Sequence, residues 1–193
     1  CSPRCPRGRS ILGEGWTSTP SRTGRWKTAC RTTWCIRISQ DAEGYLWAGT
    51  WEGAARFDGR RFTPYDAGTV QGLEVEGVRA IVPDPRGGMV LSLGRIGPGL
   101  VRVHEGRWER LPGDAGTLPD VSVLRFGPDG TLWIGTDHSL FSLQRDGRLR
   151  DVGGTHAGLA NERVQAMLPL PDGQALVGNR HGLFRIAGGR VED

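Results

Sequence analysis

One phrase of seven residues occurs four times along the chain, and this repetition constrains the fold more than any other feature. The first copy is Gly44-Tyr-Leu-Trp-Ala-Gly-Thr50, and the later copies begin at Gly88, Gly130 and Gly173. The leading glycines are therefore 44, 42 and 43 residues apart. Self-similarity with a period of about 20–50 residues is typical of solenoids, propellers and other arrays of one supersecondary unit.

Each copy consists of short apolar stretches separated by turns. One apolar stretch and a turn precede the phrase, and another follows it and ends in a glycine turn such as Asp58-Gly59. The first three copies continue into a further stretch, at 62–65, 108–111 and 149–152, which the fourth copy is expected to lack. Asp-Gly and Gly-Gly pairs supply the positive φ angles of tight hairpins, so each copy predicts up to four antiparallel strands.

Four strands in about 40–45 residues form the blade of a β-propeller. The sequence therefore predicts an all-β fold, a partial β-propeller with about four blades of four-stranded antiparallel sheet. The blades are expected over approximately 36–70, 71–116, 117–156 and 157–193, the last of them incomplete. A ring closes with about 4–8 blades, so we expect residues 36–193 alone to leave apolar blade faces uncovered and to be insoluble or oligomeric.

The phrase also predicts how neighbouring blades contact. Trp47 and Trp133 occupy the same place in their copies and are expected to be wedges between blades, with Leu91 and Leu176 replacing them elsewhere. Shortly after the wedge position stands a glycine, at Gly49, Gly135 and Gly178, where a side chain is expected to collide with the adjacent strand.

The first 35 residues differ from the rest in cysteine content and charge. All four cysteines lie there, together with seven basic residues and one acidic residue. Residues 36–193 contain 18 basic and 20 acidic residues, a net charge of −2. The overall charge of +4 therefore does not indicate a nucleic-acid partner. The cysteines have neither the spacing of a zinc site nor the distribution of a disulfide framework, so no metal and no cofactor are expected.

The copies carry a family resemblance. The order Ile-x-Gln-Asp, two residues, Gly-x-Leu-Trp-x-Gly-Thr and then Arg-Phe-Asp-Gly resembles the two-component regulator propeller repeat. Residues 38–59 match it closely, 124–147 well, 164–189 moderately and 78–106 poorly, since that copy lacks the tryptophan and the Gly-Thr pair.

The resemblance implies a role in signalling and no catalysis in this chain. In that family the repeats form the extracytoplasmic, periplasmic sensor of inner-membrane receptors whose output domain is a histidine kinase or a diguanylate cyclase. The implied partners are a small-molecule or glycan-type signal, the remaining blades and the output domain of the same receptor, and a second copy in a homodimer of the full receptor.

The family also bears on the first segment. Its repeats are introduced by a Trp-Thr-x-Asp-Gly-Leu-Pro stretch that ends in valine, and versions of it remain at 72–78, 118–123 and 158–164. Residues 23–35 lack this stretch. When the codons that can encode them are read in the frame that starts at each third position, they permit Trp-Thr-Val-Glu-Asp-Gly-Leu-Pro-Asp-Asp-Met-Val. We therefore expect residues 1–35 to be irregular and translated out of frame, the alternative being a basic disordered tail.

Several catalytic and binding motifs are absent from the sequence. The histidines, at 104, 138, 156 and 181, have no carboxylate or cysteine at metal-ligand spacing. The glycines of 94–99 precede a predicted strand, whereas a phosphate-binding loop precedes a helix. No Gly-x-Ser-x-Gly phrase appears. No catalytic residue is predicted.

The loops between the second and third strands are the candidate site. In a four-stranded blade they share a face with the connections from one blade to the next. They differ in chemistry while the neighbouring strands repeat, as expected where placed polar groups recognise a small molecule; the alternative is that exposed hairpin tips are polar in any case. The candidate ligand-binding residues are Trp51, Glu52, Arg95, Asp137, His138, Arg180 and His181.

Two other functions remain open at this stage. Propellers of the streptogramin lyase kind also carry Gly-Pro-Asp-Gly-x-Leu-Trp phrases, as at 127–133, although the catalytic histidine of such an enzyme has no assigned position here. A protein-interaction scaffold would carry the same blade phrases.

Overall fold

The computed structural model describes residues 35–66, 68–70, 77–94, 99–111, 113–154 and 156–192, which form four antiparallel sheets of four strands each. Blade 1 contains β1 (Cys35–Gln40), β2 (Leu46–Thr50), β3 (Gly53–Phe57) and β4 (Phe62–Tyr65). Blade 2 contains β5 (Val78–Pro83), β6 (Met89–Leu93), β7 (Gly99–His104) and β8 (Arg107–Arg110). Blade 3 contains β9 (Val121–Phe126), β10 (Leu132–Thr136), β11 (Leu140–Leu143) and β12 (Leu149–Asp151). Blade 4 contains β13 (Ala166–Pro169), β14 (Ala175–Asn179), β15 (Gly182–Ala187) and β16 (Arg190–Glu192).

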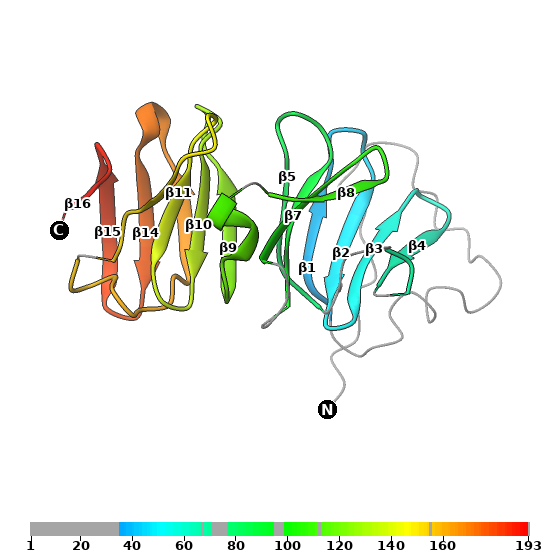
Figure 1. Cartoon of the computed structure of the whole chain (residues 1–193), viewed down its shortest axis with the longest axis horizontal. Coiled ribbons are helices and arrows are strands. Elements are labelled where there is room, and N and C mark those ends of the chain that lie inside the picture. The colour runs from blue at the N-terminus through cyan, green and yellow to red at the C-terminus, as the bar shows by residue number, and fades with distance from the viewer. Residues whose placement is uncertain are drawn as a thin grey trace.

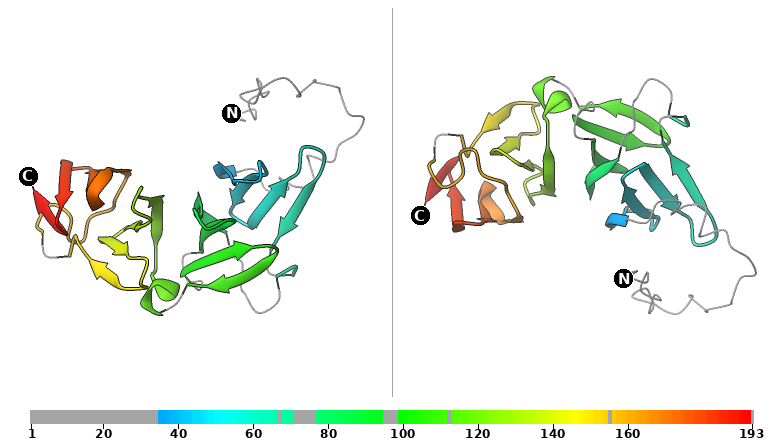
Figure 2. Two further views of the ribbon diagram at one scale, coloured as in Figure 1. Left: turned by 90° about the horizontal axis from the view of Figure 1, so that it is seen from above. Right: turned by 90° about the horizontal axis from the view of Figure 1, so that it is seen from below.

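The sheets stand side by side in chain order (Figure 1) and follow an arc when seen along the strands (Figure 2). Within each blade the strands pair in sequence order, and β1, β5, β9 and β13 contact one another along the inside of the arc. The chain is therefore a partial β-propeller, as the repeats predict. The predicted lack of a last strand in blade 4 is wrong, because β16 pairs with β15 from Arg185–Glu192 to Ala187–Arg190.

The turns show that the repeat is more regular than the sequence comparison indicates. Four glycines with positive φ close the turn between the first two strands of each blade, and they follow one another at steps of 43 residues: Gly44, Gly87, Gly130 and Gly173. The equivalent glycine in blade 2 is thus Gly87 rather than Gly88. It follows that Val90, and not Leu91, occupies the place of the tryptophan in blade 2, since Val90 pairs with Arg102 as Trp47 pairs with Arg56.

Apolar side chains fill each interface between successive blades. Trp47 is buried against blade 2 in a cluster with Val78, Met89 and Val101. Trp133 is buried against blade 4 in the equivalent cluster. The two tryptophans are therefore interblade wedges, as predicted.

The glycines that follow the wedge positions are crowded by the next blade, as predicted, in two of the three cases. A Cβ added at Gly49 would lie 2.9 Å from Cγ1 of Val78, and one added at Gly135 would lie 2.7 Å from Cβ of Val164, in each case on the next blade. At Gly178 the nearest atom would be Cβ of Ala166, 3.7 Å away on the same blade, so this glycine is not crowded within the described residues.

Two short 3-10 turns, η1 (Gly113–Thr117) and η2 (Pro171–Gly173), complete the secondary structure of the described residues. Among these residues no helix has the length and apolar character needed to cross a membrane. Of the segment 1–35, only Cys35 belongs to the described residues, so the prediction that this segment is irregular or out of frame lies outside them.

Candidate functional site

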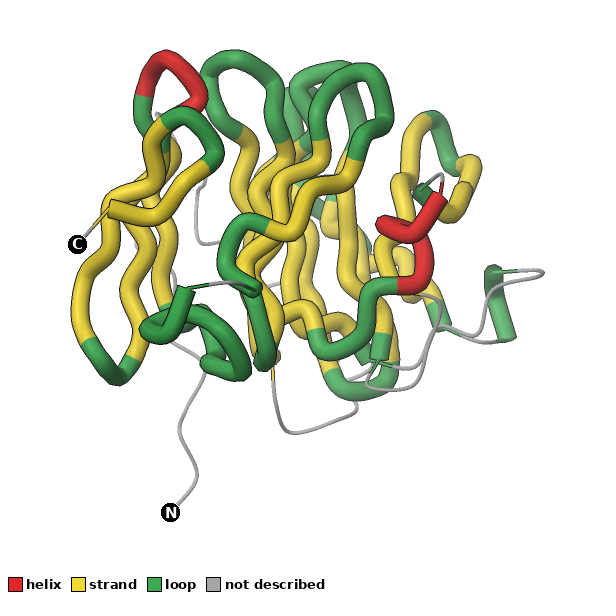
Figure 3. The backbone as a smooth tube through the Cα atoms, turned by 60° about the vertical axis from the view of Figure 1, so that its left-hand side comes forward, coloured by secondary structure: helices red, strands yellow, loops and turns green. Residues whose placement is uncertain are grey.

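The strands run between two rims of loops (Figure 3). One rim consists of the loops between the second and third strands of each blade and of the connections between blades, and we call it the connection rim. We call the opposite rim the hairpin rim. Backbone and side-chain hydrogen bonds join the two kinds of connection-rim loop in three blades. Gly94 N donates to Gly77 O (2.9 Å), Asp137 N to Asp120 O (3.1 Å) and Asn179 Nδ2 to Gly158 O (2.6 Å). In these blades each loop is therefore tied to the connection that enters the same blade.

The candidate residues lie on this rim at three separate places. Trp51 and Glu52 form the exposed tip of the blade 1 loop, with 56% of the Trp51 surface exposed. The other described candidates belong to two clusters, one around Asp137 and His138 and one around Arg180 and His181. Arg95 lies outside the described residues.

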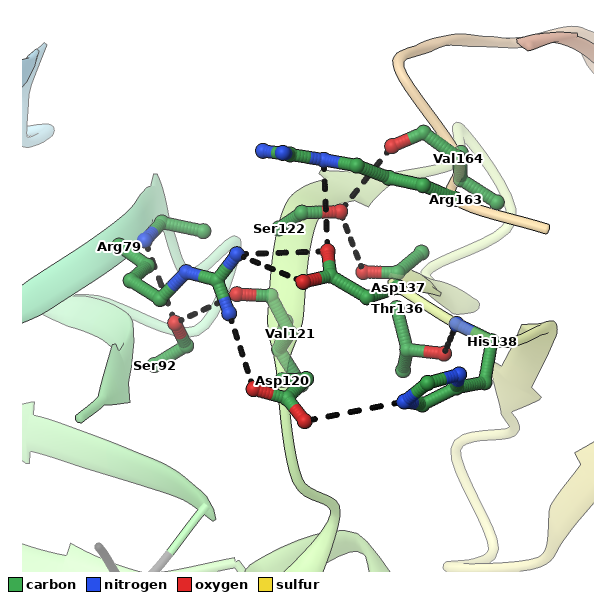
Figure 4. A network of polar contacts seen from close by, with 12 residues as sticks. Arg79, Ser92, Asp120, Val121, Ser122, Thr136, Asp137, His138, Arg163 and Val164 are labelled. Carbon is green, nitrogen blue, oxygen red and sulfur yellow. Dashed lines mark hydrogen bonds and ion pairs between the residues drawn. The ribbon is translucent and has the colours of Figure 1, made fainter. Parts of the chain in front are cut away.

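The larger cluster joins three blades through Arg79, the second residue of β5 (Figure 4). Arg79 Nη1 donates to Oδ1 of Asp120 (3.2 Å), and Nη2 donates to Oδ2 of Asp137 (3.0 Å). Nε of Arg163, from the connection into blade 4, lies 3.3 Å from Oδ1 of Asp137. His138 Nε2 lies 3.8 Å from Oδ2 of Asp120. We call these five residues the Arg79 network.

Local structure places each member of the network. Asp120 has a left-handed backbone (φ 53°) directly before β9, a conformation that aspartate tolerates better than most residues. His138 follows Thr136, whose Oγ1 accepts hydrogen bonds from the backbone N of His138 (3.1 Å) and Ser139 (2.8 Å). This turn directs Asp137 toward blade 2.

The electrostatic balance of the network leaves groups for a ligand. Two guanidinium groups face two carboxylates, and the Arg79 side chain is only 14% exposed, whereas those of Arg163 and His138 are 56% and 64% exposed. The contacts of Arg79 with Asp120 and Asp137 are therefore structural, while Arg163 presents N–H donors and His138 presents an imidazole ring to solvent. Hydrogen bonds from exposed ends of such a network can recognise polar groups.

The smaller cluster surrounds Glu162, in the connection between blades 3 and 4. Its Oε1 lies 2.5 Å from Arg180 Nη2 and 3.1 Å from His181 Nε2. The hydrogen bonds from His181 and Arg180 lower the pKa of the Glu162 carboxyl below its ordinary value. The carboxylate thus holds both candidate side chains of blade 4 at one place.

A concave groove adjoins this rim on the inside of the arc. It has a volume of about 1120 Å³ and is lined by the innermost strands, with polar groups from Arg37, Gln40, Arg125 and Gln165. Arg79 and Asp120 stand at the beginnings of β5 and β9, so the Arg79 network lies at the end of the groove where these strands begin.

Sequence reasoning missed four residues that organise these clusters: Arg79, Asp120, Glu162 and Arg163. They belong to the interblade connections or to the first residues of the innermost strands. Arg79 and Asp120 share a signal, a charged residue one position into or directly before an inner strand, whereas Glu162 and Arg163 stand four and three residues before β13 and have no such signal. No group of three His, Cys, Asp or Glu side chains in the part of the chain that the structure describes could hold a metal ion.

Comparisons with known proteins support the fold. The extracellular domain described as the hybrid two-component system BT4673 of B. thetaiotaomicron superposes with a TM-score of 0.67 at 22% identity, over 82% of this chain and 21% of that one. The extracellular domain of BT3049 from the same organism gives a TM-score of 0.66 at 22% identity, over 82% of this chain and 24% of that one. A catalytically inactive virginiamycin B lyase from Staphylococcus aureus with quinupristin gives 0.62 at 13% identity, over 82% of this chain and 54% of that one.

The chain thus spans about a quarter or less of the length of the two extracellular domains and about half of the lyase. At these identities the likeness shows the β-propeller fold. No family model and no curated protein sequence matches the chain.

Proposed function

We propose that this chain is part of a signal-recognition propeller, the extracytoplasmic and periplasmic sensor of an inner-membrane receptor in two-component or cyclic-di-GMP signalling. Its ligand is a polar small-molecule or glycan-type signal bound at the connection rim. The observation that carries the proposal is the difference between a repeated scaffold and a non-repeated rim. The blades repeat in strand pairing and turn geometry, whereas the charged groups of the rim form, among the described residues, two clusters that differ in composition.

The structural neighbours are consistent with this assignment. Two of them are extracellular domains of hybrid two-component systems, and the repeat phrases resemble the sensor propellers of such receptors. Arg163 and His138, whose side chains are exposed, belong to the Arg79 network at the end of the inner groove, where one ligand could contact several blades at once.

The experiment compares two histidines on opposite rims of the complete receptor. His138→Ala removes an exposed histidine of the connection rim; His104→Ala removes an exposed histidine of the hairpin rim and is the matched control. We expect the first variant to lose the response to the cognate signal at equal protein level and the control to keep it. Equal responses of the two variants would remove the connection rim as the recognition site.

The receptor assignment has a separate test. The coding sequence on both sides of this chain is determined by resequencing the locus. Further blades, a membrane-spanning segment and a kinase or cyclase domain in the same reading frame support the receptor. A complete propeller with no output domain contradicts it, whatever the result at the rim.

A lyase is the second candidate, and the observation that favours it is the pairing of His181 with Glu162. A carboxylate beside a histidine is a common arrangement for proton transfer, and the fold is shared with the virginiamycin B lyase. Incubation of the complete gene product with quinupristin, followed by liquid chromatography and fragment mass spectrometry, tests this function. A new product that disappears in His181→Asn supports a lyase, and unchanged quinupristin contradicts it.

A further inference from the structure

One of the three blade interfaces lacks the tryptophan wedge. Val90 stands in blade 2 where blades 1 and 3 have Trp47 and Trp133, and its side chain faces blade 3 within the apolar cluster of that interface. Valine is much shorter than tryptophan and carries no hydrogen-bond donor. The interface between blades 2 and 3 must therefore differ from its neighbours in both volume and polarity.

The polar difference centres on Asp84. In blade 1 the equivalent carboxylate, Asp41, accepts a hydrogen bond from Nε1 of Trp47 (2.8 Å). In blade 2 the side chain of Asp84 is fully buried and instead accepts from Nε of Arg102 (2.6 Å), with Nε of Arg86 3.4 Å away. Two guanidinium groups thus replace one indole as partners of the buried carboxylate.

The difference in volume follows from the same replacement. Between blades 1 and 2, Arg56 lies 4.5 Å over the ring of Tyr45 and beside Trp47, and the remaining cavity has a volume of only about 40 Å³. At the corresponding place between blades 2 and 3, beside Asp84 and Arg102, a pocket of about 420 Å³ remains open on the hairpin rim. Small-molecule sites commonly have volumes of about 300–1,000 Å³.

The lining of this pocket contains both cationic and apolar groups. Arg86, Arg102 and Arg145 line it, and Asp84 is the only carboxylate among the described lining residues, which leaves an excess of two positive charges. Among the described residues Arg145 has no hydrogen bond or ion pair, and Asp84 engages Arg86 and Arg102 only through backbone N or Nε atoms. The terminal nitrogens of three guanidinium groups are therefore available to one ligand.

The apolar side is formed by buried or half-buried groups. Leu111 is 4% exposed and Phe126 is half-buried, and both line the pocket. Arginine recognises carboxylate, phosphate and sulfate groups through paired N–H donors, and an aromatic floor favours a ligand with a ring or other apolar body.

We propose that this interblade pocket, which we call the Arg102 pocket, binds a small organic anion. The anionic group is held by the terminal nitrogens of Arg86, Arg102 and Arg145, and the apolar body of the ligand lies on Leu111 and Phe126. The site is on the rim opposite to the Arg79 network and does not depend on the proposed sensor function.

The test uses four probes with the same aromatic body: benzoate, phenyl phosphate, phenyl sulfate and the neutral benzamide. Because residues 36–193 alone are expected to be insoluble or oligomeric, binding is measured on the complete gene product, by isothermal titration calorimetry and by ligand-observed NMR. We expect at least one of the three anions to bind and benzamide to bind at least about tenfold more weakly, because charge-assisted hydrogen bonds contribute most of the affinity. The preferred anion identifies the ligand class.

Variants locate the site. Arg145→Gln is expected to weaken binding of the preferred anion about tenfold or more without affecting folding, since Arg145 is exposed. Arg148→Gln, on the same hairpin but outside the pocket, is the matched control and should bind as the unchanged chain does. Val90→Trp, which restores the wedge, should abolish binding while circular dichroism and denaturation verify folding. Equal binding of benzamide and the anions, equal loss in Arg145→Gln and Arg148→Gln, or no binding of any anion would overturn the proposal.

Discussion

Replacing Gly127 with aspartate should stabilise the chain, because it would supply an acceptor for the buried indole of Trp133. Nε1 of Trp133 has no hydrogen-bond partner among the described residues, and the residue is only 2% exposed. In blade 1 the equivalent indole, Trp47, donates to Asp41. Gly127 stands 43 residues after Asp84 and 86 after Asp41, and its backbone N donates across the same turn, to Thr131 O (2.8 Å).

The structure also indicates that an aspartate fits at this position. A Cβ built on Gly127 would lie 3.6 Å from Nε1 of Trp133, so a carboxylate there can reach the indole. The φ of Gly127 is outside the left-handed region, so the backbone admits a side chain. The one close atom would be Oδ1 of Asp129, 2.6 Å from the new Cβ. This exposed side chain can turn away if it gives up the hydrogen bonds that it accepts from Thr131 N and Oγ1.

The expected gain is the difference between two opposing effects. An unsatisfied buried donor costs about 1–3 kcal/mol, and a hydrogen bond to a charged acceptor contributes about 1.5–3 kcal/mol. Ordering and partly desolvating the new carboxylate, together with its repulsion by Asp129, offsets part of this. We expect a net stabilisation of about 1 kcal/mol, equivalent to a rise in Tm of roughly 2–4 °C for a chain of this size.

Equilibrium denaturation in urea measures the free energy of unfolding of the variants. Gly127→Ala adds a Cβ without an acceptor and is the control for backbone entropy. A second comparison, in an Asp129→Ala background, removes the repulsion between neighbouring carboxylates. Trp133→Phe removes the donor, so Gly127→Asp should give no gain in that background. A gain of equal size with phenylalanine at 133, or the same gain from Gly127→Ala, would refute the reasoning.

Two further predictions concern crowding and ionisation. Gly135→Ala should destabilise the chain by about 1–3 kcal/mol in the same denaturation assay, because its Cβ would overlap Val164, whereas Gly178→Ala should change stability by less than about 0.5 kcal/mol; similar losses at both sites would contradict the packing argument. In a pH titration followed by NMR, the Glu162 carboxyl should titrate below its ordinary pKa of 4.5, and His181→Ala should raise that pKa. Because the folded pKa is depressed, the stabilising contribution is complete at neutral pH and is lost as the pH falls through the folded value; an unchanged pKa in the variant would show that His181 is not the cause.

Much of the fold could be predicted from the sequence because turns and wedges repeat at every blade. Trp47 and Trp133 were placed at interfaces from their position in the phrase alone, and the structure confirms them there. The alignment of blade 2 failed because two adjacent glycines stand in its turn, and only the backbone conformation shows that Gly87 is the equivalent one. The outer strand of blade 4 was missed because Arg190–Glu192 carries a single apolar residue.

The location of the candidate site could be predicted from the sequence, but the residues that contact Asp137 and His138 could not. The rim loops follow from the topology of a four-stranded blade, so Asp137 and His138 could be named from the sequence. Their partner Arg79 lies 58 residues before Asp137, in another blade, and that contact depends on how neighbouring sheets are placed. No local pattern in the chain encodes that placement. Ion pairs between residues of different blades can therefore be identified only from the three-dimensional structure.

In the repeat, a carboxylate before the tryptophan accepts a hydrogen bond from the indole, as Asp41 does from Trp47. Two interfaces each lack one member of this pair. Blade 1 has both partners, Asp41 and Trp47, and its interface is closed. Blade 2 keeps the carboxylate and has Val90 in place of the indole, so arginines take over as donors and a charged pocket opens. Blade 3 keeps Trp133 and has Gly127 in place of the carboxylate, so the indole N–H has no acceptor among the described residues. The lost donor coincides with open space, and the positive charge there comes from Arg86 and Arg145, whereas the lining of the closed interface has Glu43 and Glu105. The lost acceptor leaves only an unsatisfied indole, so a ligand site is expected at the first kind of departure.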